Sequence, residues 1–122
     1  MKLPLEIIFR GMTRSEAIEA SIQGHVGRLE KFHDRVMSCR VMVEQSHRHH
    51  HHGNLYHVRV DLKMPGRELV VSREPGAHHE HEDINVTIRD AFDAARRRLE
   101  DHARRSRGDV KSHAPRGQIA GA

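Results

Sequence analysis

The sequence predicts an α+β fold whose elements follow in the order β-α-β-β-β-α, and three observations carry this prediction. Apolar and polar residues alternate over four short segments, as in strands with one buried and one wet face. Apolar residues recur every three or four positions over two longer segments, as in helices with one buried stripe. The 122 residues suit a single domain and contain no internal repeat. Both helices should therefore cover one face of a four-stranded sheet.

The first strand and the first helix are predicted within residues 3–33. The alternating apolar residues of the strand are Leu3, Leu5, Ile7 and Phe9. Gly11 ends the strand, and Thr13 with Glu16 fits a capping box, so the helix is expected to begin there. Its apolar stripe comprises Ile18, Ile22, Val26, Leu29 and Phe32. The helix is expected to end near His33.

Three further strands are predicted after the first helix. Their apolar positions are Met37, Cys39, Val41 and Val43 in the second strand, Tyr56, Val58, Val60 and Leu62 in the third, and Leu69 and Val71 in the fourth. Pro65 and Gly66 occupy the central positions of a type II turn between the third and fourth strands. Pro75 and Gly76 stop the fourth strand, because neither residue suits a strand interior.

A long final helix is predicted from about Asp83 to Arg105. Its buried stripe comprises Ile84, Ile88, Phe92, Ala95, Leu99 and Ala103. The tail after it is rich in small residues and is expected to be disordered. We therefore divide the chain into one domain, residues 1–107, and a tail, residues 108–122.

Two histidine-rich segments, residues 47–53 (HRHHHHG) and 78–81, are expected at one end of the sheet. The first two strands are joined by a helix and should run parallel, which places both segments where both helices begin. Three interpretations of the first segment stay open: a metal site, an anion contact and a solvated loop. The metal candidates are His49, His51 and His79. We interpret the segment as a loop rather than a built metal site, because its spacing matches no zinc-finger pattern.

The charge favours a polyanionic partner. The chain has 21 Lys and Arg against 17 Asp and Glu, a formal net charge of +4. Most of the cations are arginines, which suit planar, bidentate partners such as phosphate. A mixed-charge solvated surface is the alternative. No apolar run approaches the ~20 residues of a membrane span, and the single Cys39 fits a reducing compartment, so we expect a cytoplasmic protein.

The final helix and its continuation are unusually rich in arginine. The helix residues are Arg89, Arg96, Arg97, Arg98, Arg104 and Arg105. Acidic residues share its outer surface, so a salt-bridged solvated helix is the alternative. The aromatic residues all fall on apolar stripes, which argues against base stacking and for contacts with the phosphates of folded RNA. No catalytic motif is present, and Cys39 suits a packed core thiol, so neither an enzyme nor a cofactor is expected.

The sequence resembles the ribosome hibernation-promoting factor and ribosome-associated inhibitor A family, also known as sigma-54 modulation protein. The stretches that carry the resemblance are LEIIFRGM with the helix that follows, RLEKF, HVRVDLKMPGRELVVSRE and HEDINVTIRDAFDAARRRLE. The resemblance extends from about Leu3 to Arg107. It is carried by the order and spacing of these stretches together.

The resemblance implies a non-enzymatic translation inhibitor. It would bind 16S rRNA in the channel of the small ribosomal subunit for messenger and transfer RNA, under stress. Family contacts carried over by position are Arg28, Lys31, Arg89, Arg97, Arg104 and Arg105, and Arg96 and Arg98 are added from their residue type. The resemblance implies no membrane, cofactor or small-molecule substrate, and we expect a monomer. The chain is too short for the dimerisation domain of long members, so it resembles a short form.

Two other functions stay open. A general double-stranded RNA-binding protein is one, because the α-β-β-β-α part resembles that module. A metal-responsive regulator that uses the histidines is the other. The two differ in their tests: the first should bind any long duplex, and the second should bind zinc tightly.

Overall fold

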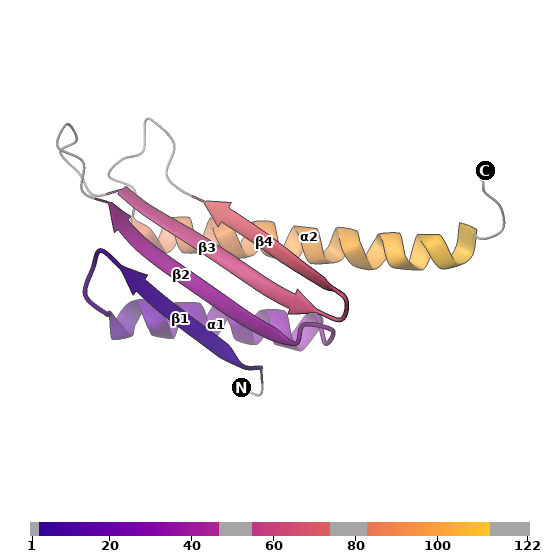
Figure 1. Cartoon of the computed structure of the whole chain (residues 1–122), viewed down its shortest axis with the longest axis horizontal. Helices are drawn as coiled ribbons and strands as arrows, with labels where there is room; N and C mark the ends of the chain where they lie inside the picture. Colours follow the sequence, from indigo (N-terminus) through magenta and orange to yellow (C-terminus); the bar gives the residue numbers. More distant parts are fainter. Residues whose placement is uncertain (1–2, 47–54, 74–82, 113–122) are drawn as a thin grey trace.

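A computed structural model of the chain describes residues 3–46, 55–73 and 83–112. The elements are β1 (Leu5–Arg10), α1 (Glu16–Phe32), β2 (Ser38–Ser46), β3 (Leu55–Met64), β4 (Arg67–Arg73) and α2 (Ile84–Ser112). Figure 1 shows one sheet backed by two helices. The predicted α+β class and the order β-α-β-β-β-α are confirmed.

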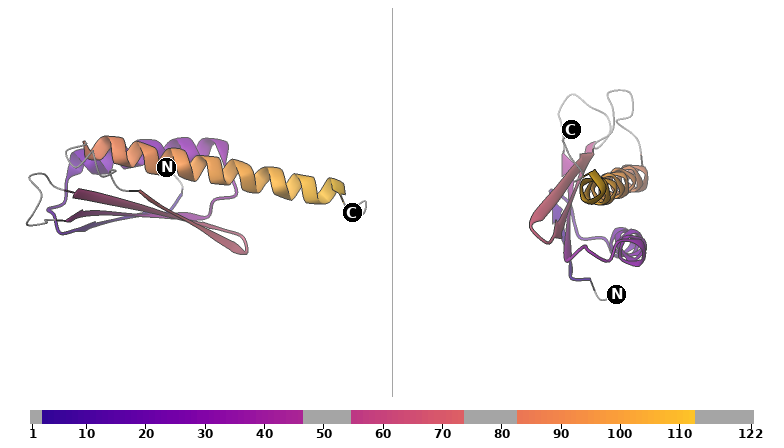
Figure 2. Two further views of the ribbon diagram at one scale, coloured as in Figure 1. Left: turned by 90° about the horizontal axis from the view of Figure 1, so that it is seen from above. Right: turned by 90° about the vertical axis from the view of Figure 1, so that its right-hand side faces the viewer.

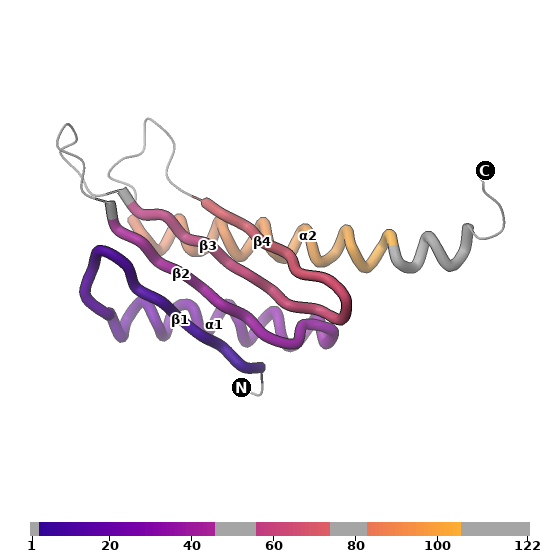
Figure 3. The backbone as a smooth tube through the Cα atoms, in the orientation of Figure 1, coloured from indigo at the N-terminus to yellow at the C-terminus, as the bar shows by residue number. Residues whose placement is uncertain are grey.

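The four strands lie in the order β1-β2-β3-β4. β1 and β2 are parallel, as expected from the helix that joins them, and the other two pairs are antiparallel. The chain path in Figure 3 shows that β2 and β4 end, and both helices begin, at one end of the sheet. The two histidine-rich segments fall outside the described residues.

Both helices cover the same face of the sheet, and the two views in Figure 2 show this two-layer arrangement. The core lies between the layers. Its fully buried side chains include Ile22 and Val26 from α1, Val41 and Val60 from the sheet, and Ile88 from α2. The predicted alternation is therefore confirmed in the central strands, whose other face is open to solvent.

The start of α1 differs from the prediction. Ser15, not Thr13, is the N-cap residue, and its hydroxyl accepts a hydrogen bond from the backbone N–H of Ile18 at 3.2 Å. Both residues have hydroxyl side chains, so the sequence offered two starting points. Gly11 (φ +67°) lies so close to the backbone carbonyl of Gln45 that a Cβ would collide with it. The turn before α1 is therefore packed tightly against the end of β2.

Two residues expected in the core are exposed. Phe32 is 71% exposed and Met37 is 53% exposed. Phe32 is the last residue of α1, where the apolar stripe runs past the edge of the core. Met37 precedes β2, which begins at Ser38. The predicted apolar pattern therefore extends one residue too far at the end of α1 and at the start of β2.

The β3–β4 hairpin and the length of α2 complete the comparison. Gly66 has φ +71°, the left-handed conformation that a type II turn requires at its third residue. The helix α2 ends at Ser112 instead of about Arg105. The division into a domain and a tail at residue 107 stays a prediction.

Candidate nucleic-acid interface

The outer surface of α2 carries two arginines that point away from the sheet. Arg97 and Arg104 are about two helical turns apart, so their side chains lie in one row. Both are exposed, whereas Ile88 and Leu99 on the opposite side of the helix are buried. This row is accessible to a large partner.

Arg89 and Arg96 lie on the side of α2 that faces α1. They share a helical row with Phe92, whose ring stacks on His25 of α1 with the ring centroids 5.0 Å apart. Burial lowers the pKa of His25, and the neighbouring Arg28 lowers it further. The structure therefore brings cations from both helices to the boundary between them.

Most of these arginines have carboxylate partners on their own helix. The pairs are Arg89 with Asp90 at 3.5 Å, Arg96 with Glu100 at 3.2 Å, and Arg104 with Asp101. Exposed pairs of this kind contribute roughly 0–1 kcal/mol, so a phosphate can replace the carboxylate at little cost. Arg97 makes no ion pair with any described residue. The same holds for Arg98 and Arg105, but only Arg97 of these three lies on the outer row beside Arg104.

Arg98 and Arg105 lie on the opposite side of α2, toward the edge strand β4. An Nη1–H of Arg98 donates to the backbone carbonyl of Val70 at 2.7 Å, so this arginine also covers an open strand edge. Arg67 of β4 lies beside them and contacts His102. The sequence analysis did not single out Arg67, because only the pairing of β3 with β4 places it next to α2.

Lys31 lies at the end of α1 together with the exposed Phe32. The Nζ of Lys31 is 5.5 Å from the centroid of the Phe32 ring, a cation–π contact. The argument that all aromatic side chains are buried is wrong for Phe32. It holds better for Phe92, which is buried, and for Phe9 and Tyr56, which are half-buried.

The open face of the sheet has balanced charge. By strand register it presents four cations and four anions: Arg10, Arg40, Arg59, Lys63, Glu6, Glu44, Asp61 and Glu68. Arg40 donates to Glu6 at 2.9 Å across the β1–β2 pair. A hydrogen bond from Arg59 to Asp61, also at 2.9 Å, raises the pKa of Arg59. Two arginines of this face, Arg40 and Arg59, therefore have carboxylate partners, in contrast to Arg97.

The described part of the chain offers little support for a metal site, a reactive thiol or a membrane span. The metal candidates His49, His51 and His79 fall outside it, and within it no group of three His, Cys, Asp or Glu side chains could hold a metal ion. Burial raises the pKa of the Cys39 thiol to about 12, so this thiol is a poor nucleophile. No described helix has the length and hydropathy needed to cross a membrane.

The fold and the charge distribution define a small α+β protein with a basic final helix behind a charge-balanced sheet. Residues 5–107 match the family described as Sigma 54 modulation protein / S30EA ribosomal protein. The chain belongs to this family of ribosome-associated proteins, and the resemblance seen in the sequence is confirmed.

The solved structures that are similar to this chain include the following two. A ribosomal subunit interface protein from Coxiella burnetii has a TM-score of 0.68 at 13% identity, over 83% of this chain and 98% of that chain. The N-terminal domain of Protein Y from Thermus thermophilus has a TM-score of 0.59 at 18% identity, over 84% of this chain and 99% of that chain. At these identities the likeness establishes a shared fold. A search of curated proteins finds no match.

Proposed function

We propose that this protein is a ribosome hibernation factor that binds 16S rRNA through its helical layer and inhibits translation. The observation that carries the proposal is the difference between the two faces. The open sheet face carries equal numbers of cations and anions. The helix α2 carries seven arginines and one lysine against five acidic residues. A polyanion is therefore attracted to α2 rather than to the sheet.

The site proposed for rRNA is the outer surface of the two helices. It comprises Arg28 and Lys31 of α1 and Arg89, Arg96, Arg97, Arg98, Arg104 and Arg105 of α2. Contacts to phosphates orient a protein on RNA without reading its sequence. Folded rRNA presents phosphates in a fixed arrangement, and a rigid helical layer can match that arrangement. Such binding is strongly salt dependent, because counterions are released from the RNA.

In this proposal, the protein inhibits translation only by where it binds on the ribosome. The protein would occupy the channel of the small subunit for messenger and transfer RNA and exclude both. This requires no bond to be made or broken, no cofactor and no small-molecule substrate. A monomer in the cytoplasm is sufficient, and idle ribosomes under stress would be the target.

The proposal is tested by co-sedimentation with purified small ribosomal subunits at low and physiological salt. The double variant R97E/R104E reverses two charges of the outer row. We expect it to bind at least about 10-fold more weakly than the wild type, since two phosphate contacts become repulsive. R40E/R59E makes the same change in net charge on the open sheet face and should bind nearly as well as the wild type.

Single substitutions refine this test. R97Q should weaken binding more than R96Q, because Arg96 already shares its charge with Glu100 at 3.2 Å. Thermal unfolding of each variant checks that the fold is retained. Equal losses in R97E/R104E and R40E/R59E would show that net charge, not the helical layer, drives binding.

A duplex RNA competitor separates the alternatives. Binding to subunits that survives excess duplex supports a ribosome-specific factor. If the excess duplex displaces the protein from the subunits, the protein is a general double-stranded RNA-binding protein. If neither RNA binds, the metal-responsive function becomes the hypothesis to test, and zinc titration follows.

A further inference from the structure

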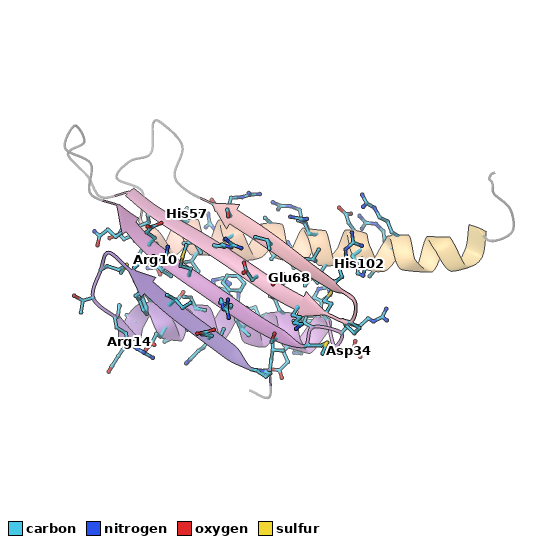
Figure 4. The ribbon with its side chains drawn as sticks, viewed as in Figure 1. Arg10, Arg14, Asp34, His57, Glu68 and His102 are labelled. Atoms are coloured by element: carbon cyan, nitrogen blue, oxygen red, sulfur yellow. The ribbon has the colours of Figure 1, made fainter. Side chains whose placement is uncertain are left out.

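A basic hollow lies where α2 passes the β3–β4 hairpin. Its volume is about 220 Å³, several times the ~30 Å³ that one water occupies in the liquid. Its lining residues are Arg67, Leu69, Arg98, Asp101, His102 and Arg105. Figure 4 shows His102 on α2 close to the hairpin. The hollow combines side chains from distant parts of the sequence, such as Arg67 and His102, which are 35 positions apart.

The walls of the hollow are positioned by both elements. Arg67 pairs with Met64 in the register and so faces the helices. Its Nη1 lies 3.1 Å from Nδ1 of His102. Since a guanidinium has only donors, Nδ1 accepts this bond and the ring hydrogen is on Nε2. On α2, Arg98, His102 and Arg105 follow at spacings of four and three, which places them in one row.

The charges of the hollow are mostly uncompensated. Three guanidinium groups converge on it, and Asp101 is the one carboxylate among the lining residues. Asp101 pairs with Arg104 on the outer row. Within the described residues, neither Arg67 nor Arg105 has an ion-pair partner. Like charges gathered in this way repel one another until an anion joins them.

The shape of the donors indicates which anion fits. Guanidinium groups present planar forks of N–H donors that match phosphate oxygens. Arg98 uses one donor on the carbonyl of Val70 at 2.7 Å, and this bond holds its remaining donors at the hollow. Arg105 follows Arg104 directly in the sequence, so the hollow borders the outer row of α2. One RNA strand crossing α2 could therefore contact both.

We propose that this hollow holds one phosphate group of an RNA backbone, with Arg67, Arg98 and Arg105 as its ligands. The inference rests on the proposed function and extends the RNA surface from the helical layer around α2 to the β3–β4 hairpin. Arg67 becomes an RNA-binding residue in a strand. His102 is a positioning residue, because it holds the Arg67 guanidinium at the rim.

The variant R67Q, made in the full 122-residue chain, tests this proposal. Binding to purified small subunits is measured over a series of salt concentrations. R67Q should bind about threefold to tenfold more weakly than the wild type. The slope of log K against log salt should become shallower by roughly 0.7–0.9, the change expected when one phosphate contact is lost.

Two further variants separate a phosphate contact from other effects. R73Q removes the same charge from the same strand, at its other end, where Arg73 donates to the backbone carbonyl of Ser72. R73Q should bind like the wild type. R67K keeps the charge without the planar fork, so it should keep most of the salt slope and lose part of the affinity.

Several outcomes would overturn the proposal. One is an R67Q variant with unchanged affinity and slope, and another is an equal loss in R73Q. In a third outcome, inorganic phosphate binds the wild type but not R67Q, while the two proteins bind RNA equally well. The hollow would then bind a free anion rather than a phosphate of the RNA backbone.

Failure of the proposed function is distinguishable from failure of this inference. If the wild type does not bind small subunits, the proposed function fails, and the same variants are compared on a short RNA duplex. Weaker duplex binding by R67Q than by R73Q would then support the phosphate site, and equal binding or none would overturn it.

Discussion

Replacing Thr87 with valine should stabilise the protein. Thr87 lies near the start of α2 and is 2% exposed. Its Oγ1 is buried and has no hydrogen-bond partner among the residues that the structure describes. The backbone N–H of Thr87 donates to the carbonyl of Asp83 at a long 3.4 Å. Valine has nearly the same shape but a methyl group where threonine has the hydroxyl.

The expected gain follows from two contributions. A buried hydroxyl without a partner costs about 1–3 kcal/mol, and Thr87→Val removes this cost. The added methyl contributes up to ~0.8 kcal/mol by burial. The helix propensities of Thr and Val are similar, so helix propensity contributes little to the change in stability. We therefore expect the free energy of unfolding to rise by about 1–3 kcal/mol, and the melting temperature by roughly 4–8 °C for each kcal/mol.

Urea unfolding followed by circular dichroism measures this change. The midpoint should rise while the slope m stays constant, which identifies a change in stability alone. Thr87→Ser is the matched control: it keeps the hydroxyl and loses the methyl, so it should be less stable than the wild type. A Thr87→Val variant less stable than the wild type at constant m would refute the reasoning. The hydroxyl would then have a partner that stabilises it.

Two more predictions concern titratable groups, one half-buried and one buried. Burial and Arg28 lower the pKa of His25, and Asp93 opposes this change. Below pH 6.5, the ordinary pKa of histidine, the unfolded chain therefore binds a proton at His25 that the folded chain does not. Stability should therefore fall from pH ~7.5 to ~5.5, and less steeply in H25F, which keeps an aromatic ring beside Phe92; equal pH dependence of the two unfolding free energies would contradict this. The Cys39 thiol, whose pKa burial raises to about 12, should react with a disulfide reagent at pH ~8 only on unfolding, and rapid reaction of the native protein would show that it is accessible.

The core of the fold could be predicted from local patterns. Alternation placed Val41 and Val60 inside, and helical spacing placed Ile22 and Ile88 there. These predictions succeed because one periodicity persists over several residues, and each residue adds to the same signal. They fail at the ends of elements, where a single residue decides. Phe32 is such a case, because its spacing fits the stripe although the core has ended.

The candidate site was predictable in composition but not in arrangement. The excess of arginines on α2 follows from the sequence alone. Which of them pair with carboxylates could be anticipated only within a helix, as for Arg96 and Glu100 at four residues apart. The sequence did not indicate that Arg98 would donate to the edge of β4. Such contacts depend on how the helix lies on the sheet.

The sequence by itself determined the order of the elements, most of the core and the basic character of the last helix. These properties depend on periodicity and composition, which are local. Only the tertiary structure decided which cations are compensated by residues far away in the sequence. Arg40 is neutralised by Glu6, 34 positions away, because β1 pairs with β2. Arg67 meets His102, 35 positions away, because the hairpin packs beside α2. Folding thus distributes the charges between a balanced sheet face and a basic final helix.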